Sequence, residues 1–223
     1  MNPKRIILVR HGQSEGNENG NIYNEKPDYT LNLTEEGKKQ ASDAGKELAK
    51  ILKKETAFFY VSPFWRTRET FEQIAQHLTK DQKEYLEDPR LREQEWGHLR
   101  TKEENDRIEE ERDKYGPFYF RFPDGESCAD VYDRVSDFFG TIQRDFSKKN
   151  FPENAIIVTH GMTIRLFLMK WFHWDVETFE TYKNLDNCQL VIMEKKKGNK
   201  YTLISKLKTR PAKHGYQRPI KLK

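Results

Sequence analysis

The chain has few cysteines. Only Cys128 and Cys188 occur among its 223 residues. They form no CxxC pair and do not cluster with histidines in the pattern of a metal site. This scarcity excludes a disulfide scaffold and fits a reducing compartment, so we expect a cytoplasmic protein with no bound metal.

Long hydrophobic runs are also absent. The longest, such as residues 6–9 and 155–158, fall far short of the ~20 residues that a bilayer span requires. The basic start of the chain leads into an apolar run that ends at Arg10 without a cleavage site, which indicates a strand rather than a signal. We therefore expect no integral membrane association.

Apolar residues make up only 35% of the chain, and the 14 Phe, 10 Tyr and 4 Trp must supply much of the core. The 40 Lys and Arg and 36 Asp and Glu alternate along most of the sequence and leave a formal charge of +4. Neither this charge nor any motif indicates nucleic acid binding. The length and the absence of linkers or repeats predict one domain over residues 1–223.

Three short apolar runs each end in polar residues. Residues 6–9 lead into Arg10 and His11, residues 58–61 into Ser62, and residues 155–158 into His160. Such runs are typical of buried parallel strands, whose carboxyl ends meet at one edge of a sheet. We expect these polar side chains to lie together there.

Helical patterns alternate with the strands and predict an α/β fold, a three-layer α/β/α sandwich with a mostly parallel sheet. A basic turn at residues 195–200 between two apolar runs predicts a hairpin, so the sheet should end in an antiparallel edge. The expected helices span residues 34–54, opened by a capping box at Thr34, and residues 64–78, 101–114, 127–146 and 162–172.

Two segments stand apart from this pattern. Residues 100–126 hold a charge-dense helix and an aromatic, turn-rich stretch, which we interpret as an insertion. The aromatic stretch is either a lid over the site or the anchor of the insertion, and both remain open. From about residue 208 the chain is basic and poor in apolar residues, which predicts a tail that is surface-laid or mobile.

A site that accepts a phosphoryl group needs a nucleophile with a lone pair at neutral pH, cationic or N–H donors, and an acid for the leaving group. Histidine is a suitable nucleophile, because its ordinary pKa of ~6.5 leaves the imidazole largely neutral. His11 follows a buried strand, where a backbone carbonyl can hold one ring nitrogen and expose the other.

Residues 8–17, with Arg10-His11-Gly12 followed by Ser14 and Asn17, resemble the signature of the histidine phosphatase superfamily, the phosphoglycerate mutase-like proteins. The resemblance covers nearly the whole chain, since residues 28–37, 62–67, 91–97 and 159–161 are similar to its other segments. It implies the phosphoglycerate mutase-like fold.

By this resemblance His11 is the phosphorylated nucleophile and Glu93 the proton donor. Arg10, Arg66 and His160 would hold the phosphoryl oxygens, with neither metal nor cofactor required. Glu95 is the alternative to Glu93. Singly, each residue also has a purely structural explanation, and only the ordered combination favours a site.

Further residues are predicted to bind substrate. Ser14, Asn17, the main-chain N–H groups near Gly12 and the N–H of Gly161 are expected to orient the phosphate. Met162, which follows Gly161, is also predicted to bind substrate. Residues 122–134 resemble a stretch of the phosphatases in which Glu126 and Ser127 would line the leaving-group pocket.

The resemblance favours a phosphatase acting on a small phosphorylated metabolite. Mutases of the family usually carry paired arginines that grip a second phosphate or carboxylate, whereas the insertion here holds Arg107, Arg112 and Arg121 singly. The alternatives are a cofactor-dependent phosphoglycerate mutase and a catalytically inactive interaction protein that docks through its tail. A homodimer is left open.

Overall fold

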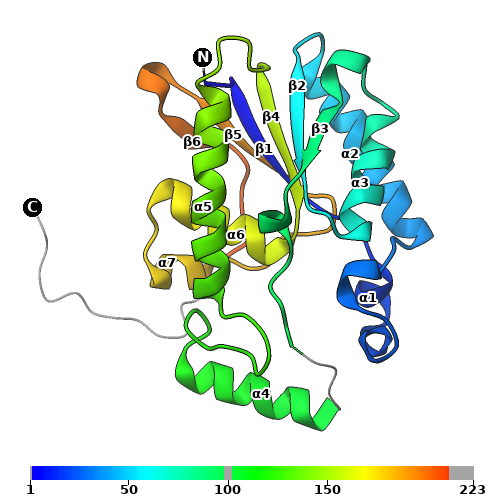
Figure 1. The fold of residues 1–223 in the computed structure, drawn as a ribbon, viewed down its shortest axis with the longest axis vertical. Helices are drawn as coiled ribbons and strands as arrows, with labels where there is room; N and C mark the ends of the chain where they lie inside the picture. Colours follow the sequence, from blue (N-terminus) through cyan, green and yellow to red (C-terminus); the bar gives the residue numbers. More distant parts are fainter. Residues whose placement is uncertain (1, 98–101, 211–223) are drawn as a thin grey trace, which may run out of the picture.

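The computed structural model describes residues 2–97 and 102–210. A six-stranded sheet in the order β3-β2-β4-β1-β5-β6 forms its centre (Figure 1). The neighbours from β3 to β1 are parallel, and β5 and β6 add an antiparallel edge. The strands are β1 (Arg5–Arg10), β2 (Ala57–Val61), β3 (Glu84–Glu87), β4 (Asn154–Thr159), β5 (Leu190–Lys195) and β6 (Tyr201–Leu203). The predicted α/β class and its antiparallel edge are confirmed.

Helices cover both faces of the sheet. Figure 1 shows α2 and α3 on one side and α5, α6 and α7 on the other, which is the predicted three-layer arrangement. The helices are α1 (Glu15–Glu18), α2 (Glu35–Leu52), α3 (Trp65–Ala75), α4 (Lys102–Tyr115), α5 (Cys128–Phe146), α6 (Gly161–Phe172) and α7 (Val176–Thr181). Short 3-10 turns lie at Gly20–Asn24, Asp28–Thr30, Lys80–Gln82, Pro89–Leu91 and Lys197–Asn199.

The alternation of side chains along the strands divides the core into two layers. In β1, Ile7 and Val9 pack with the residues of α2 and α3, whereas Ile6 and Leu8 pack with those of α5 and α6. Every second residue of a strand points to the same face, so a run that is apolar throughout must be covered on both sides. This explains why the strands read as unbroken apolar runs.

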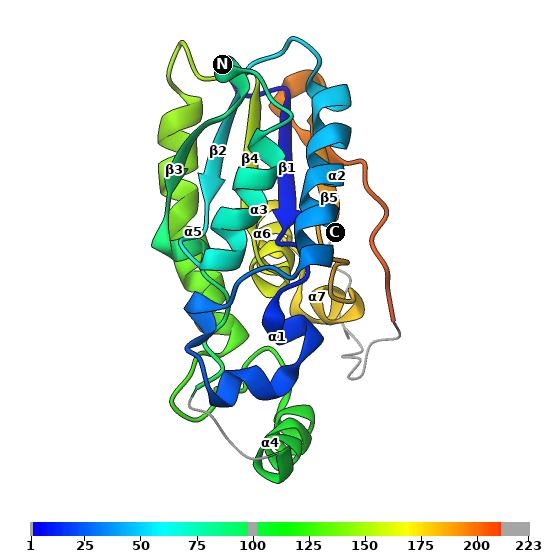
Figure 2. The ribbon, with the colours of Figure 1, turned by 90° about the vertical axis from the view of Figure 1, so that its right-hand side faces the viewer.

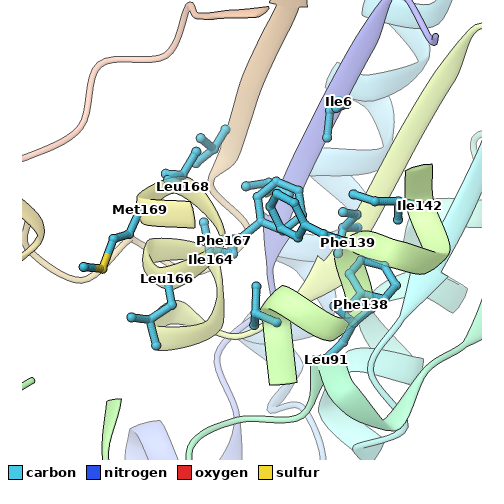
Figure 3. Packing of buried hydrophobic residues seen from close by; sticks show 14 of the residues in the cluster. Ile6, Leu91, Phe138, Phe139, Ile142, Ile164, Leu166, Phe167, Leu168 and Met169 are labelled. Atoms are coloured by element: carbon cyan, nitrogen blue, oxygen red, sulfur yellow. The ribbon is translucent and has the colours of Figure 1, made fainter. Parts of the chain in front are cut away.

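Aromatic rings fill much of the layer under α5 and α6. Figure 3 shows Phe139 of α5 beside Phe167 of α6, and their ring centroids lie 4.7 Å apart. Phe138 meets Tyr60 of β2 edge to face at 5.4 Å. Large rings bury much area for each residue, so they offset the modest apolar share of the sequence.

Local sequence sets the helix starts. The Thr34 hydroxyl accepts the Gly37 N–H at 3.0 Å and caps α2. The predicted capping box is wrong there, because the third position of the helix is Gly37, which has no side chain to return a bond to Thr34. A complete capping box is instead formed by Ser127 and Asp130 at the start of α5.

The four-residue helix α1 was not predicted, and neither were two elements of the layers, β3 and α7. β3 is a short edge strand whose residues are mostly exposed, so it lacks the apolar run that marked the other strands. α7 has six residues, too few for a clear helical period. Both were missed because their sequence patterns are weak, although each completes a layer of the fold.

The carboxyl ends of the parallel strands face the end of the molecule where α1 and α4 lie (Figure 2). The chain from 208 to 210 lies along α7 and the residues after it, where Lys183 N–H donates to the Lys208 carbonyl at 2.9 Å and Arg210 N–H to the Thr181 carbonyl at 2.7 Å. This part of the tail is surface-laid, and the rest of it falls outside the described residues. The division into one domain with an insertion at about 100–126 stays a prediction. No described helix is both long and apolar enough to cross a bilayer.

Candidate active site

The ends of β1 and β4 bring two histidine rings close together, tilted against each other. The ring centroids of His11 and His160 lie 5.2 Å apart, with 60° between the planes. The backbone N–H of His11 donates to the Thr159 carbonyl at 3.0 Å, so the parallel pairing of β1 with β4 continues into the site. Strand pairing therefore sets the distance between two imidazoles that are far apart in the sequence.

Hydrogen bonding defines the tautomer of His11. Its Nδ1 lies 2.7 Å from the carbonyl oxygen of Gly12, which can only accept, so Nδ1 carries the proton. The lone pair is then on Nε2. Burial, reinforced by the positive charges of Arg66 and Arg10, holds the pKa of His11 well below its usual range. The ring is neutral at pH 7 and suited to nucleophilic attack.

His160 is held from the opposite side. Its Nε2 lies 2.8 Å from the Ser62 hydroxyl at the end of β2, as expected for polar residues that follow neighbouring strands. Its Nδ1 is buried and has no hydrogen-bond partner among the described residues. Burial and then the charge of Arg66 lower the pKa of His160 well below its usual range. The ring presents an unused polar atom inside the protein, which points to a ligand there.

Two arginines lie beside this pair. Arg66, from the first turn of α3, is only 3% exposed and binds both carboxylate oxygens of Asp28, at 2.8 and 3.2 Å. Arg10 donates to the Leu185 carbonyl, and its Nε is buried without a partner among the described residues. Arginine forks match the oxygens of a phosphate, so the group as a whole forms an anion site.

Glu93 and Glu95 differ in their surroundings. Glu93 is partly buried, and burial raises its pKa, while Arg66 and Arg10 act in the opposite direction. Glu95 is exposed. A carboxyl group whose pKa is raised by burial, and which interacts with the charges of Arg66 and Arg10, is suited to hold a proton, so the surroundings favour Glu93 over Glu95.

A partly buried arginine, Arg134, holds the backbone that carries Glu93. Arg134 of α5 donates to the Glu93 carbonyl at 2.9 Å and also binds both oxygens of Glu126, each at 3.0 Å. It also donates to the carbonyls of Arg90 and Arg92, at 2.7 and 2.9 Å. We call Arg134 and Glu126 the clamp. It fixes the loop against α5 and so limits where the Glu93 carboxyl can lie.

Glu126 and Ser127 have local partners that the sequence did not reveal, and their place in a leaving-group pocket stays a prediction. The oxygens of Glu126 accept from Arg134, from Arg92 and from the Glu95 N–H, so the carboxylate holds the loop. The Ser127 hydroxyl caps α5 through Asp130. Neither side chain lines the cavity described below. Their motif was recognised, but their local partners were not visible in it.

The Gly12 carbonyl and N–H both have partners within the protein. The Gly12 N–H donates to the Thr70 hydroxyl at 3.0 Å, and a role for Gly12 or the neighbouring N–H groups toward phosphate stays a prediction. A Cβ at this position would lie 2.5 Å from the Gly37 carbonyl oxygen, which no side chain allows. Glycine is required here because the loop passes close to the start of α2.

Ser14 and Asn17 form a reciprocal capping box at α1. The Ser14 hydroxyl accepts the Asn17 N–H, and the Asn17 side-chain oxygen accepts the Ser14 N–H, both at 3.3 Å. That oxygen also accepts from the Asn187 amide at 3.1 Å. The two hydrogen bonds that its oxygen accepts therefore fix the orientation of the Asn17 side chain. A role for either residue toward phosphate stays a prediction.

Gly161 and Met162 begin α6 directly after His160. A Cβ on Gly161 would lie 1.9 Å from the Asn184 side-chain oxygen, so any larger residue would have to displace the Asn184 amide. The Met162 sulfur lies 3.7 Å from the Cys128 sulfur and lines a cavity beside the site. Gly161 therefore packs against Asn184, in the segment after α7, and Met162 lines the same cavity as Asn184.

Sequence reasoning missed the turn between α7 and β5. The Asn187 amide and the Cys188 N–H both donate to the His11 carbonyl, at 3.1 and 3.2 Å, and the Leu185 carbonyl binds Arg10. Cys188 adopts a positive φ of 56°, a backbone conformation that cysteine rarely takes. No periodicity or motif in the sequence indicates this turn. Its hydrogen bonds to His11 and Arg10 show that it helps to hold both residues in place.

Comparison with known proteins gives relatives over nearly the whole chain. A phosphoglycerate mutase-like protein of Arabidopsis thaliana is 39% identical over 91% of this chain and 78% of its own length. A broad-range acid phosphatase of Saccharomyces cerevisiae is 29% identical over 90% of this chain and 88% of its own. The first of these relatives is close enough to show common family membership.

Solved structures show the same fold. A mycobacterial glucosyl-3-phosphoglycerate phosphatase, solved with vanadate, superposes with a TM-score of 0.71 at 19% identity and covers 90% of this chain and 96% of its own. The Bacillus stearothermophilus protein YhfR gives 0.70 at 22% identity, covering 90% and 95%. The model of the histidine phosphatase superfamily, branch 1, matches residues 6–205. The chain belongs to the histidine phosphatase superfamily.

Proposed function

We propose that the protein is a metal-independent phosphomonoester hydrolase that acts on a small phosphorylated metabolite through a phosphohistidine at His11. The observation that carries this proposal is the His11–His160 pair at 5.2 Å, with the His11 lone pair on Nε2. Around it lie Arg10, Arg66 and Glu93. Phosphatases among the relatives support a hydrolase.

In the first step the Nε2 lone pair of His11 attacks phosphorus and the ester P–O bond breaks. The leaving oxygen takes the proton of Glu93, so an alcohol departs and Glu93 becomes a carboxylate. Arg10 and Arg66 bind the equatorial oxygens, where negative charge is spread in the transition state. If the Ser62 hydroxyl donates to Nε2 of His160, the proton of this ring is on Nδ1. The Nδ1–H of His160 would then donate to an oxygen of the phosphoryl group.

In the second step a water molecule attacks phosphorus. Glu93 takes a proton from this water, the P–N bond breaks, and its electron pair returns to His11 Nε2 as phosphate forms. His11 must be neutral and Glu93 protonated at the outset. Burial lowers the pKa of the first and raises that of the second, so both shifts widen the pH range in which the two required states coexist.

The test is hydrolysis of p-nitrophenyl phosphate in the presence of a chelator. The wild type should turn over, and His11→Ala should lose on the order of 10³-fold or more of kcat, because the nucleophile is gone. Rapid quenching of the wild type should trap a phosphoenzyme that is labile to acid and stable to base, as a phosphoramidate is. Undiminished turnover in His11→Ala would refute the mechanism.

A mutase of the same fold is the second candidate, since relatives carry that name. A mutase returns the phosphoryl group of its phosphohistidine to a bound acid instead of to water. Incubation with 3-phosphoglycerate and a trace of its bisphosphate distinguishes the two. We expect phosphate release with little isomerisation, and fast isomerisation would identify a mutase.

A further inference from the structure

A cavity of about 370 Å³ adjoins the phosphoryl site. Gln94, which follows Glu93, lines it, as do Met162 in the first turn of α6 and Asn184, which touches Gly161. Its volume lies at the lower end of the ~300–1,000 Å³ of small-molecule sites. The cavity is therefore lined by residues that directly follow Glu93 and His160 or touch Gly161.

Arg165 of α6 lines this cavity and is only 7% exposed. Its Nη2 donates to the Phe179 carbonyl at 3.2 Å, its Nη1 lies 3.8 Å from the Met162 sulfur, and the guanidinium lies 4.4 Å from the centroid of the Phe179 ring. Its Nε is buried and has no partner among the described residues. Burial lowers the pKa of Arg165 to about 10, and the group still carries its charge at neutral pH.

No carboxylate of the described residues forms an ion pair with Arg165. A buried cation without an anion is costly, since a single carbonyl and a thioether replace little of its hydration. Glu180 also lines the cavity and acts on Arg165 only through its electric field. The guanidinium of Arg165 can therefore still donate hydrogen bonds to an anion, and no carboxylate of the described residues takes that place.

Basic residues outnumber acidic ones around the cavity. Arg112 from α4, Lys183 and Arg210 line it together with Arg165, against the acids Asp113 and Glu180. Lys183 and Arg210 are exposed, so they lie at the rim, whereas Arg165 is buried. Apolar walls are formed by residues such as Trp96, Phe122 and Phe179. The cavity fits a short carbon skeleton that ends in an anion.

We infer that this cavity selects substrates whose leaving group carries its own acidic group, a carboxylate or a second phosphate, which binds Arg165. The inference rests on the proposed function, because it needs Glu93 to protonate a leaving group that extends into the cavity. The cations come mainly from α6 and from the segments around α7, rather than from the paired arginines expected of a mutase. Arg165 is thus a specificity-determining residue for hydrolysis.

Matched substrates isolate the acidic group. 3-Phosphoglycerate and glycerol 3-phosphate differ only by a carboxylate in place of a hydroxymethyl group, and fructose 1,6-bisphosphate and fructose 6-phosphate differ by one phosphate. The readout is the ratio of kcat/KM for the acidic to the neutral member, from phosphate release by the full chain. We expect at least one pair to give a ratio of about ten or more in the wild type, because a charged hydrogen bond is lost in the neutral member.

Arg165→Met keeps an unbranched side chain over Phe179 and removes the charge, so the ratio should fall toward one. Lys183→Gln, at an exposed position, should lower the ratio a few-fold, and it tests the cavity if Arg165→Met fails to fold. The matched control is Arg144→Gln, an exposed arginine of α5 that does not line the cavity. Its ratio should equal that of the wild type.

Hydrolysis of p-nitrophenyl phosphate distinguishes a failure of the proposed function from a failure of the inference about the cavity. If the wild type does not hydrolyse it, the proposed function fails. If it does, but neither pair gives a ratio above one, the inference alone is overturned. A ratio that persists both in Lys183→Gln and in folded Arg165→Met also overturns it. The pair that responds tells whether carboxylate or phosphate is preferred.

Discussion

The phosphoryl site and the cavity beside it hold their charges in different ways. In the phosphoryl site Arg66 is paired with Asp28, and His11 is fixed by the Gly12 carbonyl. In the cavity Arg165 has no carboxylate partner among the described residues, and the neighbouring Lys183 is exposed. The groups of the phosphoryl site are held in place before a substrate binds, whereas in our proposal Arg165 gains its anionic partner only from the substrate. Rate and selectivity should therefore respond to different substitutions.

The largest effect should come from Glu93→Gln, which removes the proton donor of the phosphoryl site. Turnover of alkyl phosphates should fall by about 10²-fold or more, and that of p-nitrophenyl phosphate by less, because p-nitrophenolate leaves without protonation. Steady-state kinetics on both substrates measures the difference. Glu95→Gln, at the exposed carboxylate two residues away, serves as the control and should change little. Equal losses on both substrates would assign the acid elsewhere.

A smaller effect is expected at the clamp. Arg134→Met should lower kcat for alkyl phosphates by about 10-fold to 10²-fold, because the loop that carries Glu93 shifts. The loss should be smaller for p-nitrophenyl phosphate, a pattern that simple destabilisation does not produce. Arg144→Met on the same helix is the control. If the clamp variant loses activity equally on both substrates, Arg134 contributes only to stability.

This variant also tests the separation between the two regions. Arg134→Met should leave the ratio of acidic to neutral substrates near its wild-type value, since both members need the same proton. Arg165→Met should instead change this ratio without changing the dependence on the leaving group. A variant that moved both readouts together would show that the regions act as one unit.

The smallest effect is on stability and comes from the phosphoryl site alone. His11 and His160 have pKa values well below the ~6.5 of the unfolded chain, so the unfolded state binds more protons as the pH falls below about 6.5. The free energy of unfolding is then highest above that pH and decreases toward acid. The slope should reach about 1.4 kcal/mol per pH unit for each histidine. Arg165 stays charged over this range and adds nothing to the slope.

Urea denaturation between pH 7.5 and 5 measures this slope. His160→Gln should reduce the slope of the free energy of unfolding against pH by the contribution of one histidine. His173→Asn removes an exposed histidine, tolerates the positive φ of 54° at that position, and should leave the slope unchanged. An unchanged slope in His160→Gln would mean that its imidazole is protonated in the folded protein.

Much of this architecture was predictable, for identifiable reasons. The unbroken apolar runs of β1, β2 and β4 required a parallel sheet covered on both faces, and the polar residues after them had to meet at one edge. Motif resemblance then placed Glu93, which no strand run would have revealed. The same resemblance did not reveal that Glu126 binds Arg134 and that Ser127 binds Asp130, because a motif records which residues occur and not which atoms they contact.

The amino-acid sequence by itself determined the order of strands and helices, the histidines at the strand ends and the family, since these follow from local periodicity and short motifs. Tertiary structure alone decided which groups became partners. The Arg10 guanidinium meets the Leu185 carbonyl, and Arg165 is buried without a carboxylate partner among the described residues, through contacts between distant segments. Local patterns govern backbone conformation, whereas burial and charge pairing depend on which surfaces the folded chain brings together.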